Sequence, residues 1–517
     1  MVIVSSFLLS LQCYNPKHEE SQPPTEKKMI QLLLLSFVVG ITAAEFITLP
    51  MWVAMVALLL LIVAGWLTQH RNIAFAYLAI AMTLTGYITT ELRAPQPTAP
   101  LGVVAEMEIE VVSRPSPRDG YAVADGHITK WRTGEEWHRA DDKVVLWLRC
   151  EGIEAGDIVT VASELHTPIS RYEEYNTMMR HKGYVGGVAI NESFVLDVGK
   201  HEVQTLHTRA VDKLQRYARD SSSHAIVEAM VAGERSAMPQ ELRSAYAATG
   251  LSHLMAVSGL HIGIAYIVIF VLLMPLHLIH RGHIIISVLT VIAVWLFAIM
   301  SGLSPSTIRA AIMLSMLQLT RIISTDYSAL HSLSLALLLM LIFRPGYLYN
   351  ISFQLSALAV LGILLWGMPM IYRVKVRRKI PRTIITTIII GTVATLWTLP
   401  VVSHTFGNIP LASIALTPLV LLFAYGIIAC GTITLLLPHP LSVPFAFLSE
   451  ILAKCQNYIV CLAHNYGITG VEYSMTGYHI IIYYAIFVVI TIIAKLISAK
   501  IKARERDIER RIPLELE

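Results

Sequence analysis

The chain has 517 residues, of which 55% are hydrophobic and only 15% are charged. Soluble globular domains carry about a quarter charged residues, so this composition excludes an ordinary soluble protein. Apolar runs of about 20 residues, enough to cross a bilayer, recur along the sequence. We therefore expect a polytopic α-helical membrane protein embedded in the lipid bilayer. The formal net charge of +4 is too small to identify a partner.

The sequence contains five cysteines. They form no CxxC pair and no Cys/His ligand spacing, which argues against a disulfide framework and against a structural zinc site. Free thiols are the simpler expectation, and neither a metal nor another cofactor is predicted.

The first part of the chain is polar and rich in proline, as in YNPKHEESQPPTEKK, so we expect residues 1–28 to be disordered. Residues 29–90 are predicted to form N-terminal membrane helices, from apolar segments near 30–46, 50–67 and 72–90. Two lysines precede the first segment, and an arginine separates the second from the third. Because basic residues are enriched in cytoplasmic loops, the amino terminus is expected in the cytoplasm and residue 91 outside.

Residues 91–205 have a different character. Apolar and polar residues alternate in VVAEMEIEVVS and DKVVLWLRC, and Gly, Asp and Pro interrupt the runs. This period of two predicts a small β-rich barrel or sandwich outside the membrane. Residues 101–210 hold 18 acidic and 12 basic side chains, a net charge of −6. An acidic surface argues against this domain gripping a phosphate backbone through charge alone.

Residues 206–248 are predicted as an amphipathic helical linker, and residues 249–498 as a second membrane domain with nine apolar segments. The whole chain would then have about 11 to 12 spans. The segment 445–466 contains Glu450 and other polar residues, so it could instead lie along the membrane interface. The basic stretch YRVKVRRK and the charged tail 499–517 are both expected in the cytoplasm.

Polar residues gather in three places within the second membrane domain. The stretch GLSHLMAVSGLHIGIAY contains His253, Ser258, Gly259 and His261. Ionisable groups in a hydrocarbon core cost several kcal/mol unless they face protein or water, so they suggest function. The two histidines are eight residues apart and could share one face of a continuous helix. Glycine also permits an unwound turn beside packed protein or a cavity. Tight helix packing with interhelical hydrogen bonds is the alternative explanation.

The other two places follow in chain order. In SGLSPSTIRAAIM, Pro305 can occupy the first turn of a helix that Ser304 caps, with Arg309 one turn inside. An arginine there needs carbonyls, a carboxylate, water or an anionic ligand, unless it extends to the headgroups. In NISFQLSALAVLG, Gln354 and Ser356 are polar groups at membrane depth. Packing explains either one alone, but the three places together favour a polar path.

These three stretches resemble, in the same order, the characteristic blocks of the ComEC family of competence proteins. The long GLSHLMAVSGLHIGI is the most specific of them. The earlier GIEAGDIVTVASEL and SRYEEYNTMMRHKGYVGGV are similar to the OB-like amino-terminal domain of that family. The resemblance covers about residues 30–500.

The resemblance implies an inner-membrane channel that passes one DNA strand into the cytoplasm during natural transformation. Residues 249–498 would be its competence-type channel domain, and residues 91–205 its extracytoplasmic OB-like domain. The implied partners are single-stranded DNA, a separate nuclease, a DNA receptor and a cytoplasmic helicase-type translocation protein, and a homo-oligomer is compatible with this function. The residues implied along the DNA path are His253, Ser258, Gly259, His261, Arg309, Gln354 and Ser356, with Ser304 beside them.

Many family members continue into a metallo-β-lactamase-like domain thought to degrade the strand that is not imported. This sequence ends at Glu517 and contains no HxHxDH run, so we expect a transport channel without nuclease activity of its own. Two other functions stay open. One is a proton-coupled secondary transporter of a small anion that uses His253, His261 and Arg309. The other, less favoured because no GxSxG spacing or nearby carboxylate accompanies Ser258, is an intramembrane hydrolase.

Overall fold

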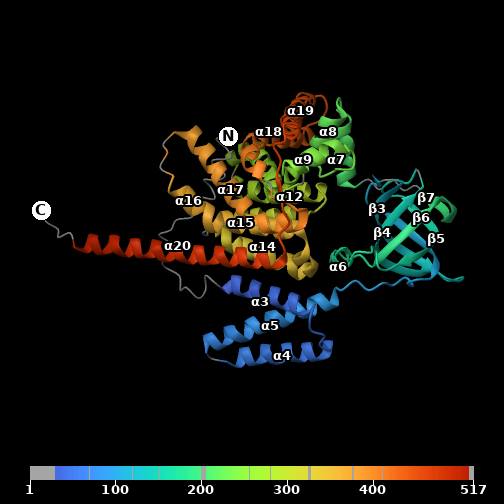
Figure 1. The fold of residues 1–517 in the computed structure, drawn as a ribbon, viewed down its shortest axis with the longest axis horizontal. Coiled ribbons are helices and arrows are strands. Elements are labelled where there is room, and N and C mark those ends of the chain that lie inside the picture. The colour runs from blue at the N-terminus through green and yellow to red at the C-terminus, as the bar shows by residue number, and fades with distance from the viewer. Residues whose placement is uncertain are drawn as a thin grey trace.

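The computed structural model describes residues 29–511 except 69, 119, 151, 200–204, 256, 280, 324–327, 375, 377 and 410. Residues 1–28, for which we expect disorder, lie outside the described residues, and so do the last six residues of the charged tail. In Figure 1 the β domain lies at one end of the helical part and the carboxyl end of α20 (Gly477–Arg511) lies at the opposite end.

Three helices begin the described chain: α3 (Met29–Ala43), α4 (Met51–Leu67) and α5 (Arg71–Leu92). The backbones of α3 and α5 approach closely through two glycines. A Cβ on Gly40 would lie 1.9 Å from the Thr83 carbonyl oxygen, and one on Gly86 would lie 2.4 Å from that of Phe37. Small residues at crossings of this kind let apolar helices pack without a hydrophobic driving force between them. Residues 29–90 therefore form three apolar helices, of which α3 and α5 pack closely together, as the hydropathy predicts.

The β domain is a small barrel, which confirms the expected OB-like architecture. Five strands close on one another in the order β1–β3–β4–β6–β5 and back to β1, and β4 pairs with β6 in parallel. Inward-facing residues are buried at every second position of β1 and β5, as the alternation predicts. The strands are β1 (Val104–Val111), β2 (Ser116–Arg118), β3 (Tyr121–Arg132), β4 (His138–Arg149), β5 (Ile158–His166), β6 (Gly186–Asn191) and β7 (Val195–Gly199), with helices α6 (Glu173–His181) and η1 (Glu192–Phe194) between them.

The segment 206–248 forms α7 (Leu206–Gln215), α8 (Ser221–Val231) and α9 (Gln240–Ala248). It is more than a linker, because every residue of α8 from Ser223 to Val231 is buried. Its apolar side chains share one core with those of α18 (Leu411–Leu436) and α19 (Val443–Asn465). Figure 1 shows α7, α8 and α9 against α18 and α19.

Seven helices in the described part of the chain are long and apolar enough to cross a membrane, and four apolar helices are shorter. They occur in both membrane regions that the hydropathy predicts, and together they approach the expected 11 to 12 spans. The segment 445–466 lies in α19, which is among the seven. The remaining elements are α10 (Ser252–Met255), α11 (Gly259–Leu273), η2 (Met274–Leu278), α12 (Gly282–Met300), α13 (Pro305–Ile323), α14 (Ala329–Phe343), η3 (Pro345–Tyr349), α15 (Ile351–Gly362), the π-helical η4 (Ile363–Gly367), α16 (Met368–Tyr372), α17 (Lys379–Phe406), β8 (Asn408–Ile409), β9 (Val471–Glu472) and α20 (Gly477–Arg511).

The β domain docks on the bundle through α6 and η3. The His181 ring stacks on Tyr349 with centroids 3.9 Å apart, and its Nδ1 lies 3.9 Å from a carboxylate oxygen of Glu45. A Cβ on Gly346 would lie 2.0 Å from the His181 carbonyl oxygen. The two backbones therefore touch at the start of η3, and this contact holds the barrel against that end of the bundle.

Candidate functional site

The helix that the first polar stretch suggests is broken in two. The short α10 ends at Met255, and α11 starts at Gly259 with Ser258 as its N-cap. The Ser258 side chain accepts a hydrogen bond from the Leu260 amide (3.3 Å), while the Ser258 amide donates to Nδ1 of His261 (3.2 Å). This is a capping box in which histidine takes the role that Glu or Gln usually has. His253 and His261 therefore lie on separate helices and not on one face of a continuous helix.

The same pair of residues tests the hydrolase hypothesis. Ser258 Oγ lies 2.8 Å from His261 Nδ1, a distance that suits a nucleophile and its base. However, Nδ1 already serves the cap, and the buried Nε2 has no hydrogen-bond partner among the described residues. Among the described residues no carboxylate orients this ring. The contact is therefore that of a helix cap, and it does not support nucleophilic catalysis.

Arg309 joins the three polar stretches. Its side chain projects from α13, is 6% exposed, and donates through Nη1 to the Ser356 carbonyl of α15. A Cβ on Gly259 would lie 2.8 Å from its Nη2, so glycine at the start of α11 leaves room for the guanidinium. Nε of Arg309 is buried and has no partner among the described residues. A buried guanidinium beside the positive end of α11 can hold a carbonyl or an anion.

The loop before α13 ties the same region together. Ser304 Oγ accepts from the Thr307 amide (3.4 Å), as expected of an N-cap for a helix that begins at Pro305. Ser304 and Ser306 both donate to the Val257 carbonyl, at 3.3 and 2.8 Å. Their bonds satisfy a backbone oxygen that the break before α11 leaves without a helical partner. These hydrogen bonds therefore stabilise both the loop before α13 and the break between α10 and α11.

Two other predicted residues lie apart from Arg309. His253 is exposed, and its Nδ1 lies 3.1 Å from the Gly250 carbonyl of its own turn. Gln354 donates to the Leu348 carbonyl (2.8 Å), and so joins α15 to the preceding η3. The structure thus brings together Ser258, Gly259, His261, Ser304, Arg309 and the backbone of Ser356.

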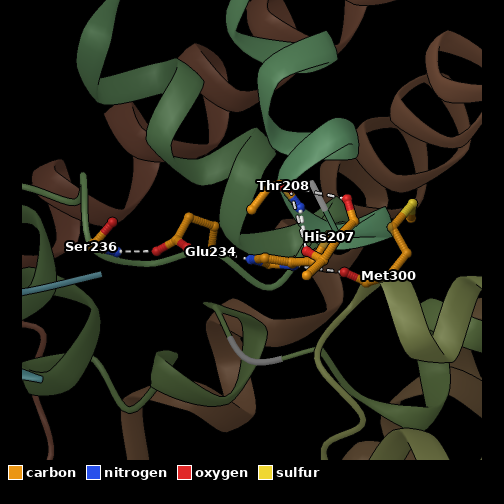
Figure 2. Close-up of polar contacts among 6 residues, drawn as sticks. His207, Thr208, Glu234, Ser236 and Met300 are labelled. Atoms are coloured by element: carbon orange, nitrogen blue, oxygen red, sulfur yellow. Dashed lines mark hydrogen bonds and ion pairs between the residues drawn. The ribbon is translucent and has the colours of Figure 1, made fainter. Parts of the chain in front are cut away.

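A polar contact that the motifs did not single out lies between α7 and the loop after α8. His207 contacts the Met300 carbonyl through Nδ1 (2.7 Å) and Glu234 through Nε2 (3.4 Å), as Figure 2 shows. The Ser236 amide donates to the other carboxylate oxygen of Glu234 (2.8 Å). The bond to Glu234 raises the pKa of His207, and the same bond lowers the pKa of Glu234 to about 2. The charged GER triplet between two helical patterns is the sequence signal that could have marked this contact.

The polar residues of α19 also have partners within the protein. Glu450 accepts from the amides of Arg219 (2.9 Å) and Asp220 (2.7 Å), in the turn before α8. Asn457 accepts from the Tyr246 hydroxyl of α9 (2.9 Å), and Gln456 donates to the same hydroxyl (2.9 Å). These side chains face α8 and α9, so their polarity does not require α19 to lie along the membrane interface.

Metal binding finds no support in this region. Within the ranges that the structure describes, no three His, Cys, Asp or Glu side chains are grouped so as to hold a metal ion. The Arg309 site itself offers hydrogen-bond donors, a buried positive charge and a helix amino terminus.

Comparisons with known proteins agree with the sequence motifs. A family model described as Competence protein matches residues 230–498, slightly more than half of the chain. ComE operon protein 3 of Bacillus subtilis is 25% identical over 223 residues, which are 43% of this chain and 27% of that protein. Recombination protein 2 of Haemophilus influenzae is 29% identical over 171 residues, which are 32% of this chain and 21% of that protein.

A third relative is an uncharacterized protein of Aquifex aeolicus, 32% identical over 166 residues, which are 32% of this chain and 38% of that protein. The matched stretches thus span well under half of each relative. No solved structure matches significantly.

Proposed function

Because this chain belongs to the ComEC family of competence proteins, with a role in DNA uptake, we propose that it is the inner-membrane channel that passes single-stranded DNA into the cytoplasm. The observation that supports this proposal most is the broken helix at α10 and α11, with Arg309 buried against it. Non-helical backbone at membrane depth is tolerated only where protein packs on it or where it lines a path through the membrane.

Several parts of the proposal concern the surroundings of the channel. The β domain would lie outside the cell and the carboxyl end of α20 in the cytoplasm, since the two are at opposite ends of the bundle in Figure 1. The nuclease, the DNA receptor and the helicase-type translocation protein would be separate chains. The strand would be held by its backbone and its shape, without base readout.

A proton-coupled transporter of a small anion is the second candidate. Arg309 at the amino end of α11 favours it, because a helix terminus with a guanidinium suits a single anionic group. The membership in a competence family favours the DNA channel, since a strand is a chain of such groups.

A transport assay distinguishes the two candidate functions. A strain that lacks this protein would be complemented with it, and nuclease-resistant uptake of labelled DNA would be measured. Vesicles that contain only this protein would then receive oligonucleotides of unrelated sequences, or inorganic phosphate. We expect restored uptake in cells and sequence-independent entry of the oligonucleotides. Entry of phosphate without oligonucleotides, together with no complementation, would support the small-anion transporter instead.

A further inference from the structure

Three basic residues lie near the contact between the β domain and the bundle. Lys143 projects from β4, Lys182 follows α6 directly, and Arg344 follows the end of α14. We call these three residues the junction cluster. Burial lowers the pKa of Lys143 most, and the positive charges of Arg344 and Lys182 lower it further. The cluster therefore combines cations from both parts of the protein.

Aromatic rings hold two of the three cations in place. Lys143 Nζ lies 4.1 Å from the centroid of the Tyr184 ring, and the Arg344 guanidinium carbon lies 5.9 Å from that of Tyr347. Both distances are within the range of cation–π attraction. Lys182 and Arg344 are exposed, and Lys143 is half-buried. The positive charge thus faces outward from the junction.

The nearby carboxylates offset the charge of the cluster only in part. Asp125 attracts Lys143 and Lys182, but its carboxylate accepts the hydrogen bond of the Tyr184 hydroxyl (2.8 Å). Glu45 lies on the other side of the contact, near His181. Among the described residues, no carboxylate forms an ion pair with any of the three cations. Like charges held close together cost free energy, which a bound anion would recover.

We propose that the junction cluster binds the phosphate backbone of an incoming single strand and directs it from the β domain to the bundle. This inference rests on the proposed function. It also gives a role to the positive charge of Lys143 and Lys182, which lie in the stretch 101–210 whose net charge is −6. The alternative ligand is an anionic lipid headgroup. We favour the strand because Lys143 belongs to a barrel strand outside the bundle, whereas a headgroup would be expected to meet only helix ends such as Arg344.

The test uses the full-length protein in nanodiscs of zwitterionic lipid and a fluorescent oligothymidine of about 30 nucleotides. The variant carries Lys182→Gln and Arg344→Gln, both exposed, which leaves Lys143 on its ring. The control carries Arg139→Gln and Arg149→Gln, two exposed positions on β4 that remove the same charge. Binding is measured across a salt series. Each lost phosphate contact lowers the salt slope of single-strand binding by about 0.7, so the variant should lose about 1.4 and the control almost nothing.

Three results would overturn the inference. Equal slopes for the variant and the control would remove the cluster from the strand path, while normal DNA uptake by that variant would leave the channel function intact. A difference between variant and control that appears only in nanodiscs with anionic lipid would assign the cluster to lipid headgroups.

If Arg344→Lys, which keeps the charge, loses oligonucleotide binding as Arg344→Gln does, the cluster does not act through its charge. A wild-type protein that neither binds nor imports any strand would contradict the proposed function itself.

Discussion

Arg309 is the residue whose burial most restricts what can replace it. Its guanidinium contacts the Ser356 carbonyl and lies against Gly259, and lysine has the charge without the planar fork that reaches both. We expect Arg309→Lys to impair DNA uptake. Arg309→Gln should lower uptake about tenfold or more, since a hydrogen bond to a charged group contributes about 1.5–3 kcal/mol. The measurement is uptake per folded molecule, with abundance read by immunoblot of the membrane fraction.

The outcome separates two roles for the same side chain. Normal uptake by Arg309→Gln at normal abundance would remove Arg309 from the transport path. If uptake and abundance fall together, Arg309 acts through the packing of α13 on α15. The structure shows the contact with the Ser356 backbone, and the contact with DNA stays a prediction.

The His207–Glu234 contact makes stability depend on pH. Because the pKa of His207 is raised on folding, its bond adds to the free energy of unfolding. This contribution is complete at pH values below the ordinary pKa of 6.5, and it is lost as the pH rises through the raised pKa of the folded protein. The lowered pKa of Glu234 likewise adds to the free energy of unfolding. This contribution is present above pH 4.5 and is lost as the pH falls toward about 2. The pair therefore stabilises the fold most between pH 4.5 and 6.5.

We expect His207→Gln to reduce the free energy of unfolding by about 1 kcal/mol within that window, because both groups are partly exposed. The reduction should shrink well above neutral pH, where the wild-type imidazole is also neutral. Thermal unfolding of the wild type and the variant in detergent, at about pH 5.5 and about pH 8.5, measures the difference. A reduction that is the same at both pH values would show that His207 contributes by packing alone.

At the scale of elements, the start of α11 depends on Gly259. A Cβ there would lie 2.8 Å from Nη2 of Arg309, so the guanidinium, whose Nη1 donates to the Ser356 carbonyl, would have to shift. Gly391, within α17, is a matched control because a Cβ on it would meet nothing within 4 Å. We expect Gly259→Ala to lower both thermal stability and DNA uptake. Gly391→Ala should leave uptake unchanged and stability equal or higher, since alanine is favoured in helices by about 1 kcal/mol. If the two variants behave alike, Arg309 does not require the space at Gly259.

Element boundaries show where local sequence patterns are sufficient. Ser304 and Pro305 predict the beginning of α13, and the Thr307 amide bond to Ser304 confirms it. The eight-residue spacing of His253 and His261 suggested one continuous helix face, but the cap at Ser258 divides it. Both features rest on backbone hydrogen bonds. The second was harder to predict because a histidine rarely takes the place of Glu or Gln in a capping box.

At the scale of the whole molecule, the sequence by itself determined the class of protein and the order of its parts. Hydropathy is a local property, so apolar runs identify membrane helices, and a period of two identifies the strands of the barrel. The competence motifs are likewise continuous stretches, and they identified the family from the sequence.

Only the tertiary structure decided which distant residues meet. Arg309 and Ser356 are 47 residues apart in the chain, and the junction cluster draws on β4, the end of α6 and the end of α14. The burial of α8 from Ser223 to Val231 likewise depends on α18 and α19, about 200 residues later. A sequence pattern records the exposure of a side chain along its own element, whereas the identity of its neighbour is set by how separate elements pack.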